Sequence, residues 1–135
     1  MDPKHNTLAS IDLSDCIIRD KDYSGFEFEN AKFLNARFER VDFSKCEFTN
    51  CNLEWARFTD CKMTQMQLSD CRLIDAEFIG CQLDGTTFSW CGLQNSGFMH
   101  TDMSGVTMEE CETDGLMRYG CMRQTQDMAE QTMWK

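Results

Sequence analysis

The sequence predicts an all-β solenoid, in which the chain winds into stacked coils of four five-residue units each. Every fifth residue from Leu13 to Met108 is large and apolar, and the residue two positions upstream is mostly small. The same residue types also recur at a spacing of twenty residues. A period of five cannot keep one face of an α-helix, whereas residues two apart in an extended chain point to the same side. The small and large residues of each unit therefore point inward together.

The predicted core consists of columns in which one type of side chain stacks on itself from coil to coil. Four five-residue units per coil place residues twenty apart in one column and give the solenoid a square cross-section. Neighbours in a column then lie at the strand spacing of about 4.8 Å. The columns that show this best are Phe38, Phe58, Phe78 and Phe98; Leu53, Leu73 and Leu93; and Cys51, Cys71 and Cys91.

The repeat divides the chain into three predicted segments. Residues 1–10 are polar and contain the only proline, and we expect them to form an N-terminal cap. Residues 11–115 are expected to form about five to six coils, because polar residues enter the large-residue positions after Met108. Residues 116–135 are expected to form a short helix that covers the last coil, mediates a homodimer, or does both. The residues assigned to that contact are Met122, Met128, Met133 and Trp134.

The spacing resembles that of the pentapeptide-repeat proteins, whose motif is commonly written A(D/N)LXX. The resemblance covers about Leu8 to Thr113, and the frequent Cys and Phe are similar to the quinolone-resistance proteins of bacteria. It implies a right-handed quadrilateral β-helix. Relatives of this kind bind the type II topoisomerases DNA gyrase and topoisomerase IV as acidic DNA mimics, and C-terminal segments mediate homodimers in several family members. The present sequence lacks the loops that interrupt the coils of the quinolone-resistance proteins.

All nine cysteines lie in the small-residue positions, which indicates buried, reduced side chains rather than disulfides. A straight column of thiols does not supply the tetrahedral geometry that zinc requires. Reduced cysteines are typical of the cytoplasm, and we expect that location. The N-terminus does not resemble a signal peptide, and no apolar run approaches the length of a membrane span.

The sequence contains no set of residues that suggests catalysis. The two histidines, His5 and His100, are far apart, and neither is in register with a candidate nucleophile. Inward-facing cysteines are poor candidates for reactive thiolates. We therefore expect a protein without enzymatic activity, metal or cofactor.

The formal net charge of −10 can be assigned to the four faces of the predicted solenoid. Face one holds residues 11–15, face two 16–20, face three 21–25 and face four 26–30, and each assignment repeats every twenty residues. Face four contains no Lys or Arg, and the adjoining face one is also acidic. The predicted acidic strip consists of Glu27, Glu29, Glu47, Asp70, Glu109 and Glu110 on face four, with Glu54 and Asp75 on face one. Outward apolar residues near it, which could anchor a partner, are Trp55, Trp90, Leu34 and Ile74.

Two hypotheses of function follow from this charge distribution. An acidic rod repels phosphates, so direct binding of nucleic acid is not expected. The first hypothesis is a DNA mimic that binds DNA gyrase or topoisomerase IV and modulates inhibition of the enzyme. The second is a scaffold or adaptor, in a secretion, effector or signalling context, that presents the acidic strip and the tryptophans to a protein partner.

Overall fold

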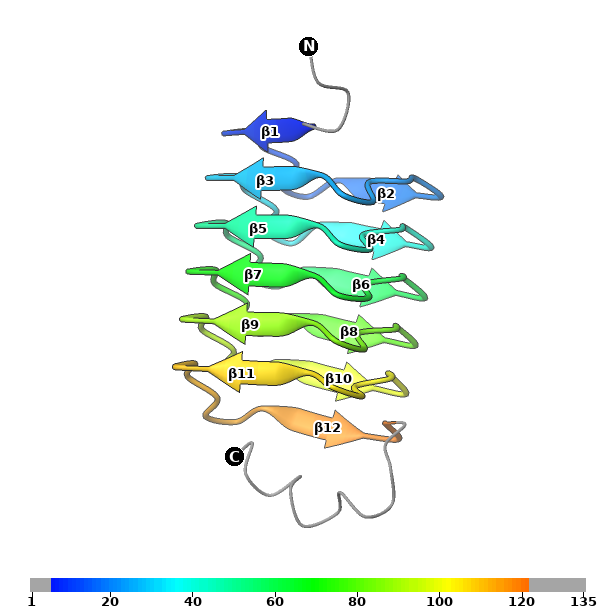
Figure 1. The fold of residues 1–135 in the computed structure, drawn as a ribbon, viewed down its shortest axis with the longest axis vertical. Coiled ribbons are helices and arrows are strands. Elements are labelled where there is room, and N and C mark those ends of the chain that lie inside the picture. The colour runs from blue at the N-terminus through cyan, green and yellow to red at the C-terminus, as the bar shows by residue number, and fades with distance from the viewer. Residues whose placement is uncertain (1–5, 122–135) are drawn as a thin grey trace.

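The computed structural model describes residues 6–121, which form a solenoid of stacked parallel coils (Figure 1). The predicted fold class is therefore confirmed. Face four is a six-stranded parallel sheet whose strands are β1 (Thr7–Ala9), β3 (Glu27–Glu29), β5 (Glu47–Thr49), β7 (Gln67–Ser69), β9 (Thr87–Ser89) and β11 (Thr107–Glu109). Face two, on the opposite side, is a second such sheet of β2 (Ile17–Arg19), β4 (Arg37–Glu39), β6 (Arg57–Thr59), β8 (Glu77–Ile79), β10 (Gly97–Met99) and β12 (Met117–Tyr119).

The register between coils is twenty residues throughout the described chain. Phe38 pairs with Phe58 between β4 and β6, and Phe58 pairs with Phe78 between β6 and β8. Faces one and three contain single bridging residues instead of strands, for example Asn52 paired with Arg72. Each unit therefore lies directly above the unit four places earlier, as the sequence period predicts.

The corners of the solenoid share one backbone conformation. Every residue at a multiple of five, from Ser10 to Gly120, has a positive φ between 51° and 77°. This left-handed region suits Gly, Asn and Asp, which explains their frequency at the fifth position of the unit. On faces one and three, an Asp or Asn at the second position accepts a bond from the backbone N–H two residues later, as Asp42 does from Ser44 at 2.9 Å. These local bonds help the chain turn without a loop.

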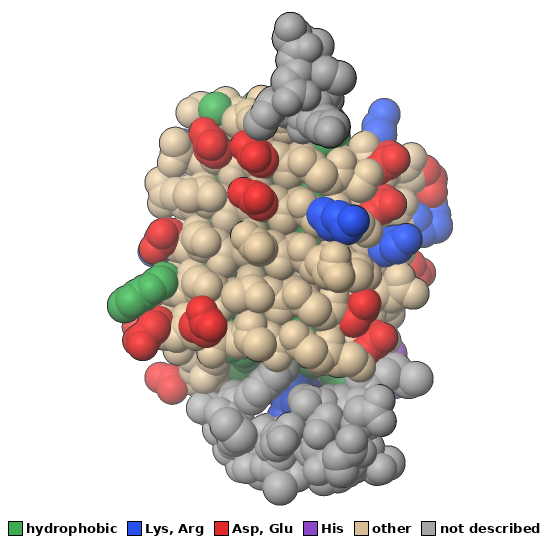
Figure 2. Space-filling view, viewed as in Figure 1, with side chains coloured by type: hydrophobic (Ala, Val, Ile, Leu, Met, Phe, Trp, Pro, Cys, Tyr) green, Lys and Arg blue, Asp and Glu red, His purple; other side chains and the backbone are tan. Residues whose placement is uncertain are grey.

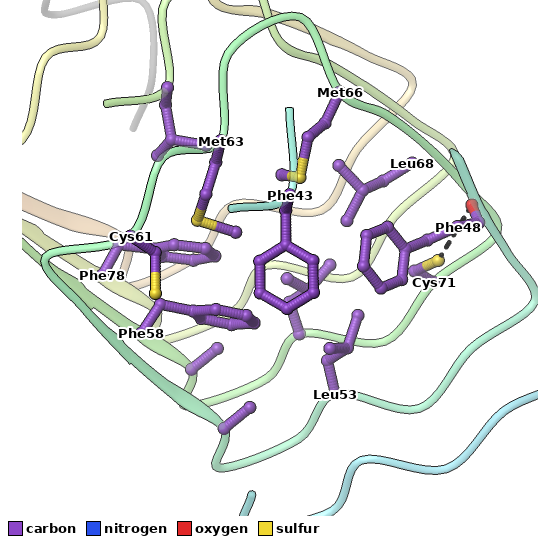
Figure 3. Packing of buried hydrophobic residues seen from close by; sticks show 14 of the residues in the cluster. Phe43, Phe48, Leu53, Phe58, Cys61, Met63, Met66, Leu68, Cys71 and Phe78 are labelled. Atoms are coloured by element: carbon purple, nitrogen blue, oxygen red, sulfur yellow. Dashed lines mark hydrogen bonds between the residues drawn. The ribbon is translucent and has the colours of Figure 1, made fainter. Parts of the chain in front are cut away.

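The interior is filled by the predicted columns of large side chains. The rings of Phe58, Phe78 and Phe98 stack with centroids 4.8 Å apart and planes within 4° of parallel. Figure 3 shows how the Phe58 and Phe78 rings lie one above the other beside Met63 and Phe43. All ten predicted core residues are buried: Phe38, Phe58, Phe78, Phe98, Leu53, Leu73, Leu93, Cys51, Cys71 and Cys91.

The coils extend further in both directions than the sequence predicted. Strand β1 lies within the predicted cap of residues 1–10 and pairs with β3. Strand β12 lies beyond residue 115, where the coils were expected to end, and pairs with β10 in full register. The half-buried Arg118 takes the core position of β12, because the pairing of β12 with β10 is made by backbone groups and does not require an apolar side chain there. Residues 6–121 contain no helix, and the predicted contact residues Met122, Met128, Met133 and Trp134 lie outside the described residues.

Candidate interaction surface

The six predicted carboxylates of face four lie on the outer side of its sheet and its corner. Glu27 and Glu47 are directly paired in register, and Glu29 and Glu109 belong to the neighbouring column of the same sheet. Among residues 6–121, face four has no Lys or Arg, and none of these six carboxylates forms an ion pair. Within residues 6–121 these carboxylates accept hydrogen bonds from neutral groups, such as the 3.0 Å bond that Thr7 Oγ1 donates to Glu27 Oε1.

The carboxylates of face four are not evenly spread along the axis of the solenoid. Figure 2 shows acidic side chains near both ends of this face and an uncharged area between them. The uncharged outer residues of the middle coils are Thr49, Gln67, Ser69, Thr87 and Ser89. The structure thus divides the predicted strip into a group at β3 and β5 and a group at β11, with Asp70 at the corner between them.

The two predicted acidic residues of face one differ from those of face four. Glu54 forms an ion pair with Arg72, so its charge is neutralised locally. Asp75 lies at the corner between faces one and two, where it lines a depression with residues of face two. The acidic surface is therefore concentrated on face four and its corner with face one, and Glu54 contributes little to it.

The predicted apolar anchors lie at different edges of the solenoid. Trp90 is 65% exposed at the corner between faces four and one, and Trp55 is 60% exposed at the corner between faces one and two. Both have left-handed backbones, with φ of 56° and 64°. Leu34 is exposed on face one, but Ile74 is only partly exposed. Bulky side chains are unusual in the left-handed region, and backbone strain of this kind often marks a functional position.

Face two carries a surface that the sequence reasoning missed. Ile17, Met117 and Tyr119 are exposed hydrophobic residues of this face, and Trp55 lines a depression of about 210 Å³ with Arg37 and Arg57 of the same face. A second depression of about 400 Å³ is lined by Gly97, Phe98, Met99, Met117, Arg118 and Tyr119. The signal was present in the period, because the outward column Thr59, Ile79, Met99, Tyr119 has three large apolar or aromatic residues in succession.

The cysteine columns are structural in their geometry. Six of the nine thiols are buried, and Cys71 Sγ donates to the carbonyl of Phe48 at 3.4 Å, one of several such bonds (Figure 3). Burial raises the pKa of Cys46 to about 12. Hydrogen bonding with the neighbouring thiols Cys51 and Cys91, together with burial, raises the pKa of Cys71 and lowers that of its two neighbours. Because only a protonated thiol can donate to a backbone carbonyl, the bonds of Cys51, Cys71 and Cys91 to such carbonyls favour a structural role for these columns.

Residues 6–121 contain no group of three or more His, Cys, Asp or Glu side chains placed to hold a metal ion. No helix within these residues is long and apolar enough to cross a membrane. Separately, the described surface has three features typical of contact sites: the acidic face four, the exposed tryptophans and the apolar part of face two.

Comparison with known proteins agrees with this architecture. The sequence profile of a family described as a pentapeptide repeat region matches residues 11–78. The curated protein sequences gave no significant match.

The solved structures that are similar to this chain include three pentapeptide-type solenoids. QnrB1, a plasmid-mediated fluoroquinolone resistance protein, has a TM-score of 0.57 at 16% identity, over 85% of this chain and 71% of that chain. A pentapeptide repeat protein from the thylakoid lumen of Arabidopsis thaliana has a TM-score of 0.55 at 20% identity, over 64% of each chain. Rfr23 from the cyanobacterium Cyanothece 51142 has a TM-score of 0.50 at 16% identity, over 88% of this chain and 92% of that chain. At these identities the likeness shows a shared fold and nothing finer.

Proposed function

The chain belongs to the pentapeptide-repeat family, and on that premise we propose that it is a non-enzymatic protein-interaction module whose acidic face four binds a basic surface of a partner protein. The observation that carries the proposal is the charge of face four. Six carboxylates lie there without a cation on the same face and without an ion pair among residues 6–121. Such a surface attracts a positively charged partner and repels a negatively charged one. At physiological salt this interaction acts over a Debye length of about 8 Å.

The specific partner that we propose is a type II topoisomerase, DNA gyrase or topoisomerase IV, bound through its DNA-binding surface. The six stacked strands of face four span about 24 Å at 4.8 Å per coil. One strand of B-form DNA carries a phosphate every 3.4 Å, or about seven over that length. The six carboxylates of face four are close to this number but form two groups, so the face imitates the phosphates near the two ends of one short strand rather than an even row. The fold shared with QnrB1, a fluoroquinolone resistance protein, supports the choice of enzyme.

Binding to the purified enzymes tests this proposal directly. We expect the protein to bind gyrase or topoisomerase IV at micromolar concentration, to alter supercoiling or its inhibition by a quinolone, and to lose affinity as salt rises. The double variant Glu47→Lys with Asp70→Lys should reduce binding at least tenfold. The matched control is Asp60→Lys with Asp84→Lys, which makes the same change in net charge away from face four and should reduce binding far less. Absence of binding by the wild-type protein would exclude the topoisomerases as partners.

A scaffold or adaptor function is the second candidate, and the exposed tryptophans favour it. Trp90 lies at the corner between faces four and one with a left-handed backbone, where most other corners have Asn, Asp or Gly. Keeping a bulky residue there suggests that the ring has a use outside the fold. A partner whose binding survives the Glu47→Lys and Asp70→Lys changes but is lost in Trp90→Asn would identify an adaptor instead of a DNA mimic.

A further inference from the structure

Face two has the chemistry of an interaction surface in its own right. Six large hydrophobic residues are exposed in the described chain, and three of them, Ile17, Met117 and Tyr119, lie on this face. A fourth, Trp55, lines the depression that Arg37 and Arg57 form on the same face. Tyr, Trp and Arg are the residue types most enriched among the residues that dominate binding energy at protein interfaces. This surface lies on the opposite side of the solenoid from the acidic face four.

The cations of face two are paired except for one. Arg19 Nε donates to Glu39 Oε1 at 2.7 Å, and Arg57 Nε donates to Glu77 Oε1 at 2.9 Å, each to the residue one coil away. Arg37 has no such partner among residues 6–121, because its neighbours in the column are Ile17 and Arg57. Arg37 is exposed and has the guanidinium of Arg57 beside it in the column, so this part of face two is locally positive and can bind an added carboxylate.

The indole of Trp55 lies next to this unpaired guanidinium. The depression of about 210 Å³ is lined by Trp55, Arg37 and Arg57, together with Asn35, Asp75 and Glu77. The corner positions above and below Trp55 are Asp75 and Asn35, which suit a left-handed backbone far better than Trp does. A carboxylate that binds Arg37 would therefore have an aromatic surface beside it for its own side-chain methylenes or for a neighbouring apolar residue.

The second depression lies further along the same face and is apolar. Gly97 leaves a gap in the outward column between Glu77 and Met117, and Met99 and Tyr119 flank it in the next column. It lies three to four coils from Arg37, or about 14–19 Å at 4.8 Å per coil. An extended peptide covers this distance in about four to six residues at about 3.3 Å each, and an α-helix in about ten to thirteen residues at about 1.5 Å each.

From these observations we infer that face two binds a segment of a partner protein that carries an acidic residue and, about 14–19 Å further on, a large apolar residue. The carboxylate pairs with Arg37 and lies beside Trp55, and the apolar side chain enters the depression above Gly97. Charge complementarity selects such a segment: a basic segment would leave Arg37 unpaired, and a nucleic acid would be repelled by the net charge of the chain. This inference does not depend on the function proposed for face four.

The test uses the full-length protein and a phage-displayed library of random twelve-residue peptides. Selected sequences are synthesised with a fluorescent label, and their affinity is measured by fluorescence anisotropy. We expect them to be enriched in Asp or Glu together with Leu, Phe or Trp at the spacing above. Arg37→Glu and Trp55→Asn should each weaken binding at least tenfold, and circular dichroism should show that both variants keep the fold, since Arg37 has no ion pair and Asn suits a left-handed corner.

Two further variants separate a binding role from a structural one. Gly97→Val fills the apolar depression without strain, because an added Cβ meets no atom closer than Met99 Cε at 3.6 Å, and we expect at least a tenfold loss of binding with unchanged or greater stability. Trp90→Asn is the matched control for Trp55→Asn, because it makes the same substitution at a corner away from face two. It should leave peptide binding intact, and so should the double variant Glu47→Lys with Asp70→Lys.

Three outcomes would overturn the inference. In the first, the selected peptides show no preference for acidic residues. In the second, they bind the Arg37→Glu and Gly97→Val variants as tightly as the wild type. In the third, light scattering shows that the protein self-associates and that Gly97→Val abolishes this association, which makes a second copy of the chain the occupant. Failure of the topoisomerase test does not affect this experiment, because the two use different faces and different variants.

Discussion

The stacked phenylalanines make the strongest quantitative prediction. Phe78 is fully buried between Phe58 and Phe98, with both ring centroids 4.8 Å away and both planes within 4° of parallel. Replacing it by Leu keeps most of the volume, and Leu already fills the same inward position in other columns, as at Leu73. The loss in Phe78→Leu is then mainly that of two ring pairs at about 0.5–1.5 kcal/mol each, or about 1–3 kcal/mol. Phe78→Ala adds a cavity and should cost about 3–5 kcal/mol.

Chemical denaturation measures both values. Unfolding in guanidinium chloride, followed by far-ultraviolet circular dichroism and by tryptophan fluorescence, gives the free energy of unfolding and its denaturant dependence. Because each coil contacts only its neighbours, a lesion at Phe78 could also uncouple the coils on either side and make the two signals report different midpoints. If Phe78→Ala cost less than about 2 kcal/mol with coincident transitions, the column would not be packed as described.

Three other predictions concern the thiols, the corner ion pairs and the glycines. Ellman's reagent should react promptly with only the three half-buried thiols of the native protein, and with the six buried ones only after unfolding; prompt reaction of all nine would contradict their burial. The prompt thiols are expected to be Cys16, Cys111 and Cys121. A hydrogen bond from Arg40 holds the pKa of Asp20 below its usual 3.8, so the stabilisation is present above that value and is lost as pH falls through the folded-state pKa. Asp20→Asn should therefore make the unfolding midpoint in urea less sensitive to pH below about pH 4, whereas an unchanged profile would mean that the pair is not formed in solution. Gly80→Ala and Gly25→Ala should each destabilise by about 1–2 kcal/mol, because both positions have a left-handed backbone, with φ of +67° and +76°. The new Cβ at position 80 would lie 2.6 Å from Asp60 Oδ1, but this carboxylate is the end of an exposed side chain and can move away. Unchanged stability in both variants would refute the left-handed corners.

Much of the fold could be predicted from the sequence because one local rule repeats. Two of every five positions face inward, and a wrong register would place Glu or Arg where Phe58 and Phe78 lie. The same rule predicted that the thiols are inward-facing. The end of the coils could not be predicted this way, because β12 is held by backbone hydrogen bonds to β10 that do not require an apolar residue at Arg118.

The interaction surfaces were predicted less well than the core. The outward positions of a solenoid have no periodic constraint, so sums of charge over a face hide how the charges are arranged along it. Glu54 counts as a negative charge in such a sum, but its pairing with Arg72 follows from the conformation of two side chains on neighbouring coils. Likewise, Trp55 was assigned to face one by its place in the unit, whereas the depression that it lines is formed mostly by face two. Side-chain direction at a corner is not fixed by sequence spacing.

The corners connect the fold of this protein to its surfaces. Each corner requires a left-handed residue, and Gly, Asn or Asp meets this requirement at the least cost in backbone strain. Trp55 and Trp90 satisfy it less well, and each is more than half exposed, so burial of the ring recovers only part of its hydrophobic free energy. Because the strain is present in the free protein while most of the ring surface remains unburied, a partner that covers the ring gains binding energy without a further change in the backbone. A flat-sided rod with a rigid interior and aromatic side chains fixed at its edges is thus already arranged for binding before a partner arrives.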